Sequence, residues 1–197
     1  MDNNFEDKEY DDIEIKEEKN KKIISGIYEW VEEFMVAISV IVILLTVVIR
    51  VVTVSGTSMM PNYYHNDRLV ISSYVGEVKA GDVVVIVDVL EEPIIKRVIA
   101  TEGQTVDISD GSVYVNGEAL DNSIYNVKNG ITYIESSAVN PMEFPCTVPE
   151  NHIFVLGDNR RVSNDSRYSE IGMVDERKVL GKAIFNIFPF DRIGSVK

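Results

Sequence analysis

The chain has 197 residues, of which 45% are hydrophobic and 26% charged, and its formal net charge is −13. This acidic balance, without a stripe rich in Lys and Arg, argues against nucleic acid as the main partner, because phosphate binding needs clustered cations. The chain contains one cysteine, Cys146, and two histidines, which exclude an intramolecular disulfide framework and disfavour a Cys- or His-rich metal centre. We therefore expect no metal and no other cofactor.

The charge is concentrated near the N-terminus. Residues 1–33 carry twelve acidic and five basic side chains, so they hold seven of the thirteen excess negative charges. Within this segment, residues 1–22 have few apolar side chains and cannot bury enough surface to offset the entropy lost on ordering. We expect residues 1–33 to form an acidic, largely disordered tail.

An apolar run follows the tail. Residues 34–49 carry no charge, and the run continues to residue 54 with Arg50 as its one charged side chain. A helix over 34–54 would rise about 31 Å, close to the hydrocarbon thickness of a bilayer. We interpret it as a transmembrane signal anchor. A buried core segment and a cleaved signal peptide are the alternatives, but a cleaved signal would begin with a short basic stretch and end in small residues.

Basic residues flank the run unequally. Four lysines lie between residues 16 and 22, whereas a comparable window after the run contains Arg50 and Arg68. Cytoplasmic flanks carry the excess of basic residues. The sequence therefore predicts a single-pass protein of the cell membrane, with lipid as a partner, a cytoplasmic N-terminus and an extracytoplasmic body.

Beyond the run, short β-branched stretches alternate with turn residues. The expected strands are 83–89, 94–100, 113–115, 152–156 and 179–187. Asn116-Gly117 is the strongest short hairpin signal, and no amphipathic helical period of useful length appears in this part. We predict a mainly β fold with an antiparallel core.

A change of composition divides this core. Residues 101–150 are rich in Gly, Asn, Ser and Asp. We interpret them as a small β insert between the two halves of the core, residues 51–100 and 151–197.

The residues of this chain permit one type of hydrolytic site, a serine nucleophile activated by another side chain. A Ser/His/Asp triad needs a histidine that accepts the serine proton, but His152 lies in an apolar strand and His65 in a polar turn, so we interpret both as structural. The chain has no H-E-x-x-H motif for metal-dependent hydrolysis. A serine activated by a lysine remains.

Ser58 and Lys96 are the candidates for that pair. Ser58 lies in SGTSMMP, where glycine permits a sharp turn and proline stiffens the adjoining backbone. Lys96 lies in an apolar strand with Ile94 and Val98 on its own face. If Lys96 points inward, desolvation lowers its pKa and the neutral amine can act as a general base. A lysine at a strand end can equally face solvent, so the spacing alone leaves this pairing open.

Four segments occur in a recognisable order: SGTSMMP at 55–61, AGDVVVI at 80–86, KRVIA at 96–100 and GDNRRVSNDSR at 157–167. Together they resemble the conserved boxes of bacterial type I signal peptidases, and the single span with a short insert resembles their Gram-positive form. The resemblance implies a membrane-bound serine endopeptidase with a Ser/Lys dyad. Its substrates would be exported preproteins, cut after small residues at −3 and −1.

The resemblance also implies roles for individual residues. Ser58 would be the nucleophile, Lys96 the general base and Ser163 the serine that hydrogen-bonds the lysine and orients it. The Ser58 backbone N–H is the natural first donor to the oxyanion. Some members of the family place a second donor, a serine, where this chain has Gly56, so the source of that donor is open; Asn62 also departs from the family, which usually has Thr there.

Four charged residues match the supporting network of the family. Asp165 and Arg167 would form a buried ion pair, Asp158 would be a further acid of the network, and Arg97 is the arginine after the base. Without the resemblance, the loop 157–167 would be interpreted as a solvated polar loop.

Small apolar pockets would select the substrate, because an extended peptide presents alternate side chains to one face. By family position the lining residues are Val52, Val54, Met59, Leu69, Val85 and Ile95. All six could equally be ordinary core residues.

Three other functions are considered. The chain could be a processing peptidase dedicated to a narrow set of surface proteins, or an inactive homologue that serves as a membrane-anchored binding protein. The presence of both Ser58 and Lys96 argues against the inactive homologue. The apolar run disfavours a self-cleaving repressor of related core fold.

Overall fold

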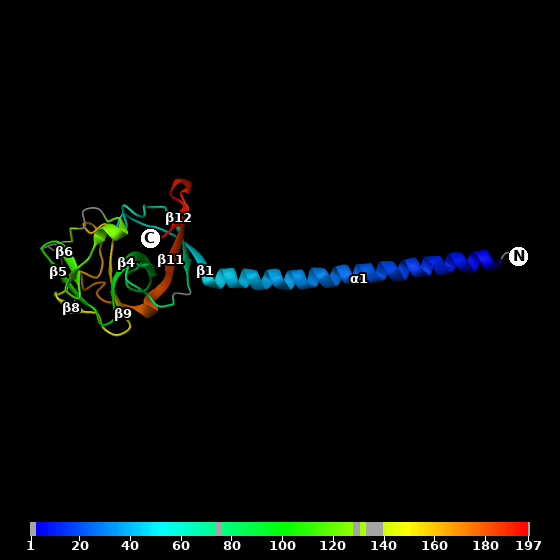
Figure 1. Ribbon diagram of the computed structural model, residues 1–197, viewed down its shortest axis with the longest axis horizontal. Coiled ribbons are helices and arrows are strands. Elements are labelled where there is room, and N and C mark those ends of the chain that lie inside the picture. The colour runs from blue at the N-terminus through cyan, green and yellow to red at the C-terminus, as the bar shows by residue number, and fades with distance from the viewer. Residues whose placement is uncertain (1–2, 74–75, 128–130, 133–139, 197) are drawn as a thin grey trace. The chain divides into compact units, whose positions relative to one another are not determined.

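The computed structural model describes residues 3–73, 76–127, 131–132 and 140–196 (Figure 1). The chain divides into two compact units, Met1–Thr46 and Val47–Lys197. The first unit consists of helix, and the second is built from β-strands and short 3-10 helices.

The first unit is formed by α1, which spans Asn3–Val48. The backbone of the predicted acidic tail is helical from Asn3 onward. The segment has no proline and one glycine, Gly26, so few residues interrupt a helix there. Within the described residues, no helix combines the length and hydropathy needed to cross a bilayer.

The helix also ends earlier than expected. The apolar run continues to residue 54, but the helix stops at Val48 and β1 (Ile49–Thr53) follows. Every residue of β1 except Arg50 is β-branched, which suits a strand. The strand pairs antiparallel with β2, with Val51 opposite Val70, so the last part of the run belongs to the main sheet.

The main sheet of the described chain has eight antiparallel strands in the order β1-β2-β11-β3-β4-β9-β10, and β12 also pairs with β11. The bounds of the strands after β1 are β2 Arg68–Ser72, β3 Val83–Ile86, β4 Ile94–Thr101, β9 His152–Leu156, β10 Val174–Asp175, β11 Val179–Phe188 and β12 Gly194–Ser195.

The predicted antiparallel β fold is confirmed, and the predicted strand 152–156 coincides with β9. The predicted strand 83–89 is too long, because β3 stops at Ile86 and Asp88 adopts a left-handed backbone conformation with φ of 57°. Such a conformation ends the extended backbone that a strand requires.

A second sheet lies within residues 101–150. Its order is β7-β6-β5-β8, with bounds β5 Thr105–Ser109, β6 Ser112–Val115, β7 Glu118–Ala119 and β8 Cys146–Thr147. Asn116 and Gly117 join β6 to β7 with φ of 53° and 83°, the left-handed pair that a tight hairpin turn needs. The 3-10 helix η1 (Asn122–Tyr125) comes next; η2 (Glu176–Lys178) and η3 (Phe190–Arg192) lie nearer the C-terminus.

The two sheets share an apolar core. Phe154 and Leu156 of β9 are fully buried, and they pack with Val106 and Val113 of the second sheet. Phe144 meets Phe154 edge to face, with ring centroids 6.0 Å apart. The insert is therefore fixed against β4 and β9, the strands that approach the Ser58 loop.

Replacing Phe154 by Ala should lower the free energy of unfolding by about 3–5 kcal/mol, because the side chain is fully buried and its removal leaves a cavity. Phe190→Ala is the matched control. Its ring is 79% exposed, so the change should be within about 0.5 kcal/mol. Denaturant unfolding of the full chain measures both, and equal losses would contradict the packing of the two sheets.

Candidate active site

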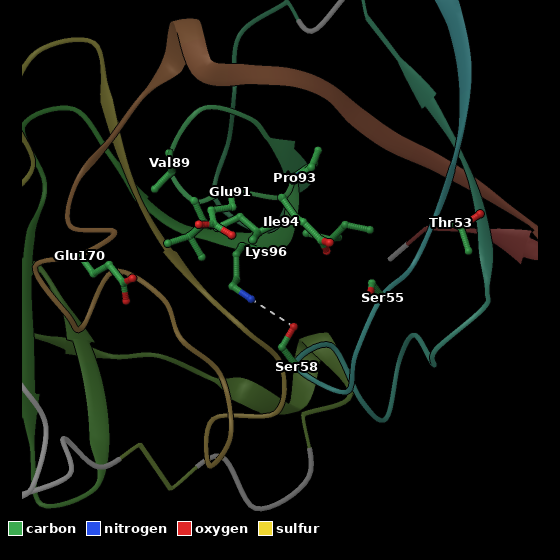
Figure 2. A pocket seen from close by; sticks show the side chains of 12 residues that line it. Thr53, Ser55, Ser58, Val89, Glu91, Pro93, Ile94, Lys96 and Glu170 are labelled. Carbon is green, nitrogen blue, oxygen red and sulfur yellow. Dashed lines mark hydrogen bonds between the residues drawn. The ribbon is translucent and has the colours of Figure 1, made fainter.

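Ser58 and Lys96 meet in the structure. The Nζ atom of Lys96 lies 3.1 Å from the Oγ atom of Ser58, within hydrogen-bond distance (Figure 2). Lys96 lies in β4 and is 3% exposed, whereas Ser58 is only partly buried. Of the two orientations that the sequence left open for Lys96, the structure has the inward one, and the side chain faces a hydroxyl that is only partly buried.

Burial lowers the pKa of Lys96 below its ordinary value. The charge of Arg167 acts in the same direction, whereas Asp165 and Asp158 act against it. Because desolvation is the largest influence, the neutral amine is favoured relative to a lysine in water. A neutral amine next to a hydroxyl can accept its proton, which is the requirement for a general base.

A loop between β1 and β2 carries Ser58. Gly56 has a φ of 82°, a conformation that favours glycine, and its N–H donates to Nδ1 of His65 at 3.2 Å. On the other side, the Asn159 N–H donates to the Ser58 carbonyl at 2.9 Å, and the Asn159 side chain donates to the Thr57 carbonyl at 3.1 Å. These bonds fix the backbone on both sides of the hydroxyl, and His65 has the structural role expected from the sequence.

The backbone N–H of Ser58 is free to act as a donor. Within the described part of the chain it makes no hydrogen bond. The Gly56 N–H, by contrast, already has His65 as its acceptor.

Two buried ion pairs lie in and beside the loop 157–167. Arg167 binds Asp165 through Nε at 2.7 Å and Nη2 at 3.0 Å, and Arg97 binds Asp158 through Nε and Nη2, both at 2.8 Å. All four side chains are at most 1% exposed. The interpretation of a solvated polar loop is therefore wrong, and the expected network consists of two bidentate pairs.

Ser163 is buried beside Gly157, and the contact leaves no room for a side chain there. A Cβ atom on Gly157 would lie 2.2 Å from Ser163 Oγ and 2.6 Å from the Ser58 carbonyl oxygen. The Ser163 hydroxyl donates to the Asn164 carbonyl at 3.4 Å. Among the described residues it has no hydrogen bond to Lys96, so its orienting role stays a prediction.

The sequence did not single out Arg160 as a functional residue. Its guanidinium is buried and donates to the Gly157 carbonyl at 3.0 Å, to Thr132 Oγ1 at 2.9 Å and to Asn122 Oδ1 at 2.9 Å. Burial lowers its pKa to about 10. These bonds connect the loop 157–167 to the insert. The next residue, Arg161, is exposed, and the sequence contains no signal that tells the buried arginine from the exposed one.

The Ser58–Lys96 pair opens onto a cavity of about 690 Å³. Thr53 and Ser55 lie on one side of the pair and Ile94 on another (Figure 2), and Ile95 also lines the cavity. Its remaining lining residues are Val89, Leu90, Glu91, Glu92, Pro93 and Glu170.

The six predicted substrate-pocket residues gather in one apolar cluster. Val54, Met59, Leu69 and Val85 are buried members, and Val52 and Ile95 pack against them. Ile95 also lines the cavity. No group of His, Cys, Asp and Glu side chains in the described part of the chain is arranged to hold a metal ion.

A serine hydroxyl hydrogen-bonded to a buried lysine, carried by an antiparallel β fold, has the parts of a serine hydrolase with a lysine base. The family described as signal peptidase, peptidase S26, matches residues 27–188. The chain belongs to this family of serine peptidases.

Relatives of this family are similar to the chain over nearly its whole length. Signal peptidase I of Bacillus licheniformis is 32% identical, over 90% of this chain and 97% of that protein. Signal peptidase I T of Bacillus subtilis is 31% identical, over 92% and 99%, and signal peptidase IB of Staphylococcus aureus is 30% identical, over 83% and 91%. A solved signal peptidase I from Enterococcus faecalis is 27% identical with a TM-score of 0.41, covering 55% of this chain and 97% of that one.

Gly157→Ala should reduce the kcat of the peptidase by roughly tenfold or more, because the added Cβ pushes against the Ser58 carbonyl and shifts the loop that holds the hydroxyl. Gly194→Ala is the matched control, since a Cβ there has no atom within 4 Å. Steady-state kinetics and melting temperatures of both variants check the effect. An unchanged kcat in Gly157→Ala would show that the loop tolerates the displacement.

Proposed function

We propose that this protein removes N-terminal signal peptides from exported preproteins as a type I signal peptidase. The 3.1 Å contact between Lys96 and Ser58 carries the proposal, because it joins a nucleophile and a base at a cavity in a chain of the signal peptidase family. The same contact argues against an inactive homologue that serves only as a binding protein.

The reaction follows from this contact. Ser58 Oγ attacks the carbonyl carbon of the scissile bond while Lys96 takes the hydroxyl proton. The resulting ammonium then donates a proton to the leaving amine, and an acyl-enzyme remains. Water attacks the acyl-enzyme with Lys96 again as the base, which releases the signal peptide and restores Ser58.

The oxyanion of each tetrahedral intermediate needs a donor that is in place beforehand. We assign the Ser58 N–H as the first donor to the oxyanion, because it has no other acceptor among the described residues. The Gly56 N–H is an unsuitable second donor, since its bond to His65 would have to break.

The cavity suits an extended peptide with small side chains at −3 and −1. Its lining includes Thr53, Ser55, Ile94 and Ile95. Through Ile95 it adjoins the apolar cluster that contains Val54 and the other predicted pocket residues. Small apolar side chains can enter such a surface, whereas a bulky one would overpack it.

We also propose that the enzyme is held at a membrane through residues 34–49, with the N-terminus on the cytoplasmic side. The run carries no charge, and several of its large apolar side chains on α1 are exposed; Phe34 is 66%, Met35 59% and Ile43 61% exposed. An apolar helical surface exposed in this way is stabilised by transfer into lipid. The lysine excess at residues 16–22 supports the orientation.

Ser58→Ala and Lys96→Ala should each lower kcat/KM for a preprotein by roughly 10³-fold or more, because one removes the nucleophile and the other the base. Ser109→Ala and Lys79→Ala, at exposed positions outside the site, are the matched controls. The assay is the cleavage of a preprotein by the full chain in lipid. Near-normal turnover of Lys96→Ala would contradict the dyad and make His152 the next candidate base.

Lys96→Met should abolish cleavage but raise the free energy of unfolding. In the folded wild type the pKa of Lys96 is lowered, so the unfolded chain binds more protons and stability rises with pH up to the unfolded pKa. Methionine fills similar space and has no charge to desolvate. Denaturant unfolding at several pH values should show the Lys96-dependent slope in wild type and its loss in the variant.

The same pKa direction fixes the pH dependence of catalysis. Activity should fall toward acid as Lys96 becomes protonated, since the ammonium cannot accept a proton. The kcat/KM profile of the wild type measures this, and an undiminished rate at acid pH would contradict a lysine base.

A further inference from the structure

Asn62 connects three parts of the site, and no role has yet been assigned to it. It lies in the loop that carries Ser58 and is half-buried. Its Nδ2 donates to Asp158 Oδ2 at 2.7 Å and to the Tyr125 carbonyl at 2.7 Å, while its Oδ1 accepts from Asn126 Nδ2 at 3.2 Å. Both N–H donors and the carbonyl acceptor of this amide therefore bind groups that are far from Asn62 in the sequence.

The contact with Asp158 leads directly to the strand of the base. The same Oδ2 atom accepts from Arg97 Nη2 at 2.8 Å, and Arg97 is the residue after Lys96 in β4. Asp158 and Arg97 are fully buried, so their positions are tightly constrained. Asp158 thus bridges the Ser58 loop and the Lys96 strand, in addition to the direct contact of Lys96 with Ser58.

The contacts with the insert hold the amide in one orientation. Tyr125 ends η1, and its ring lies under the Arg97 guanidinium at 4.9 Å. Its carbonyl and the Asn126 side chain bind opposite ends of the Asn62 amide. A flip of the amide would place a carbonyl oxygen against Asp158 and Tyr125, both acceptors, so the observed orientation is strongly preferred.

We propose that Asn62 is a positioning residue of the Ser58–Lys96 pair, which keeps the nucleophile loop in register with β4 through the Asp158–Arg97 ion pair and is itself held by η1. The inference deepens the proposed function and rests on it, because it concerns the same pair. It also gives the insert a part in the reaction: η1 aligns a loop that it does not itself belong to.

The chemistry at this position is demanding. Leucine has nearly the same shape but would remove one of the two donors to Asp158 Oδ2 and the Asn62 donor to the Tyr125 carbonyl, and loss of a hydrogen bond by a buried group is costly. Aspartate keeps the shape but sets a second carboxylate against Asp158. The two substitutions therefore separate loss of the contact from addition of a charge.

The test compares Asn62→Leu and Asn62→Asp with wild type in preprotein cleavage. In Asn62→Leu we expect kcat to fall about 10- to 100-fold, with KM changed by less than about threefold, since the loss concerns alignment of the reacting atoms. Val113→Ala is the control for stability. It removes buried atoms from the second sheet, away from the dyad, and should lower the melting temperature without lowering kcat.

Asn62→Asp supplies a readout that a merely structural role would not move. The charged groups acting on Lys96 are Asp165, Arg167 and Asp158, and a further acid beside Asp158 favours the ammonium. The acid limb of the kcat/KM profile should therefore shift to higher pH, and the Lys96 pKa measured by NMR on the full chain, without substrate, should rise.

Two outcomes would overturn the inference: a kcat of Asn62→Leu within twofold of wild type, or a loss no larger than that of Val113→Ala together with an unmoved Lys96 pKa in Asn62→Asp. These differ from failure of the proposed function, in which wild type itself would not cleave preproteins. If wild type does not cleave preproteins, the Lys96 pKa measured by NMR in wild type and in Asn62→Asp still tests the inference, because it needs no substrate.

Discussion

The site depends on keeping one lysine amine neutral inside the protein. Burial lowers the pKa of Lys96, but two carboxylates, Asp165 and Asp158, act on it in the opposite direction. Either acid, if unpaired, would stabilise the ammonium and so oppose the effect of burial more strongly. Each is instead held by an arginine in a bidentate pair, Arg167 and Arg97 respectively. The arginines therefore do more than brace the loop 157–167, because they compensate the charges that would otherwise turn the base into an acid.

The two reacting groups are held by different means. Lys96 lies in β4, between β3 and β9, so the sheet fixes its backbone. Ser58 lies in a loop, which has no strand partner and is more mobile by nature. The structure compensates with bonds from the loop 157–167, where Asn159 binds the Ser58 carbonyl and Gly157 packs against it without a side chain. Precision at the nucleophile thus comes from one loop supporting another.

Local patterns account for the part of the fold that could be predicted from the sequence. β-branched runs bounded by turn residues located β4, β9 and β11, and Asn116-Gly117 located a hairpin, because each depends on neighbours in the chain.

The order of four boxes, rather than any residue type, located Ser58 and Lys96. Their 3.1 Å contact joins positions 38 residues apart. The structure departs from the expectations where contacts are distant in sequence, or where composition leaves the balance between helix and disorder open. The backbone of the acidic tail is helical from Asn3, and α1 contains no proline and one glycine. The membrane helix was predicted to continue to residue 54, but residues 49–53 form β1, which pairs with β2 in the main sheet. The roles of Asn62 and Arg160 were missed because the partners that connect them to other segments lie 28 to 96 positions away.

Burying so many charged groups opposes folding, since a desolvated ion pair seldom stabilises as much as apolar packing of the same volume. Arg97, Arg160 and Arg167 are each at most 3% exposed. The surroundings must supply the stability that they do not. Apolar clusters supply it, one around Leu69, against which Ile95 of the cavity packs, and one around Phe154 between the sheets. The insert contributes to the second cluster as well as to the hydrogen bonds of Arg160 and Asn62, so it stabilises the polar site twice, by packing and by satisfying its donors.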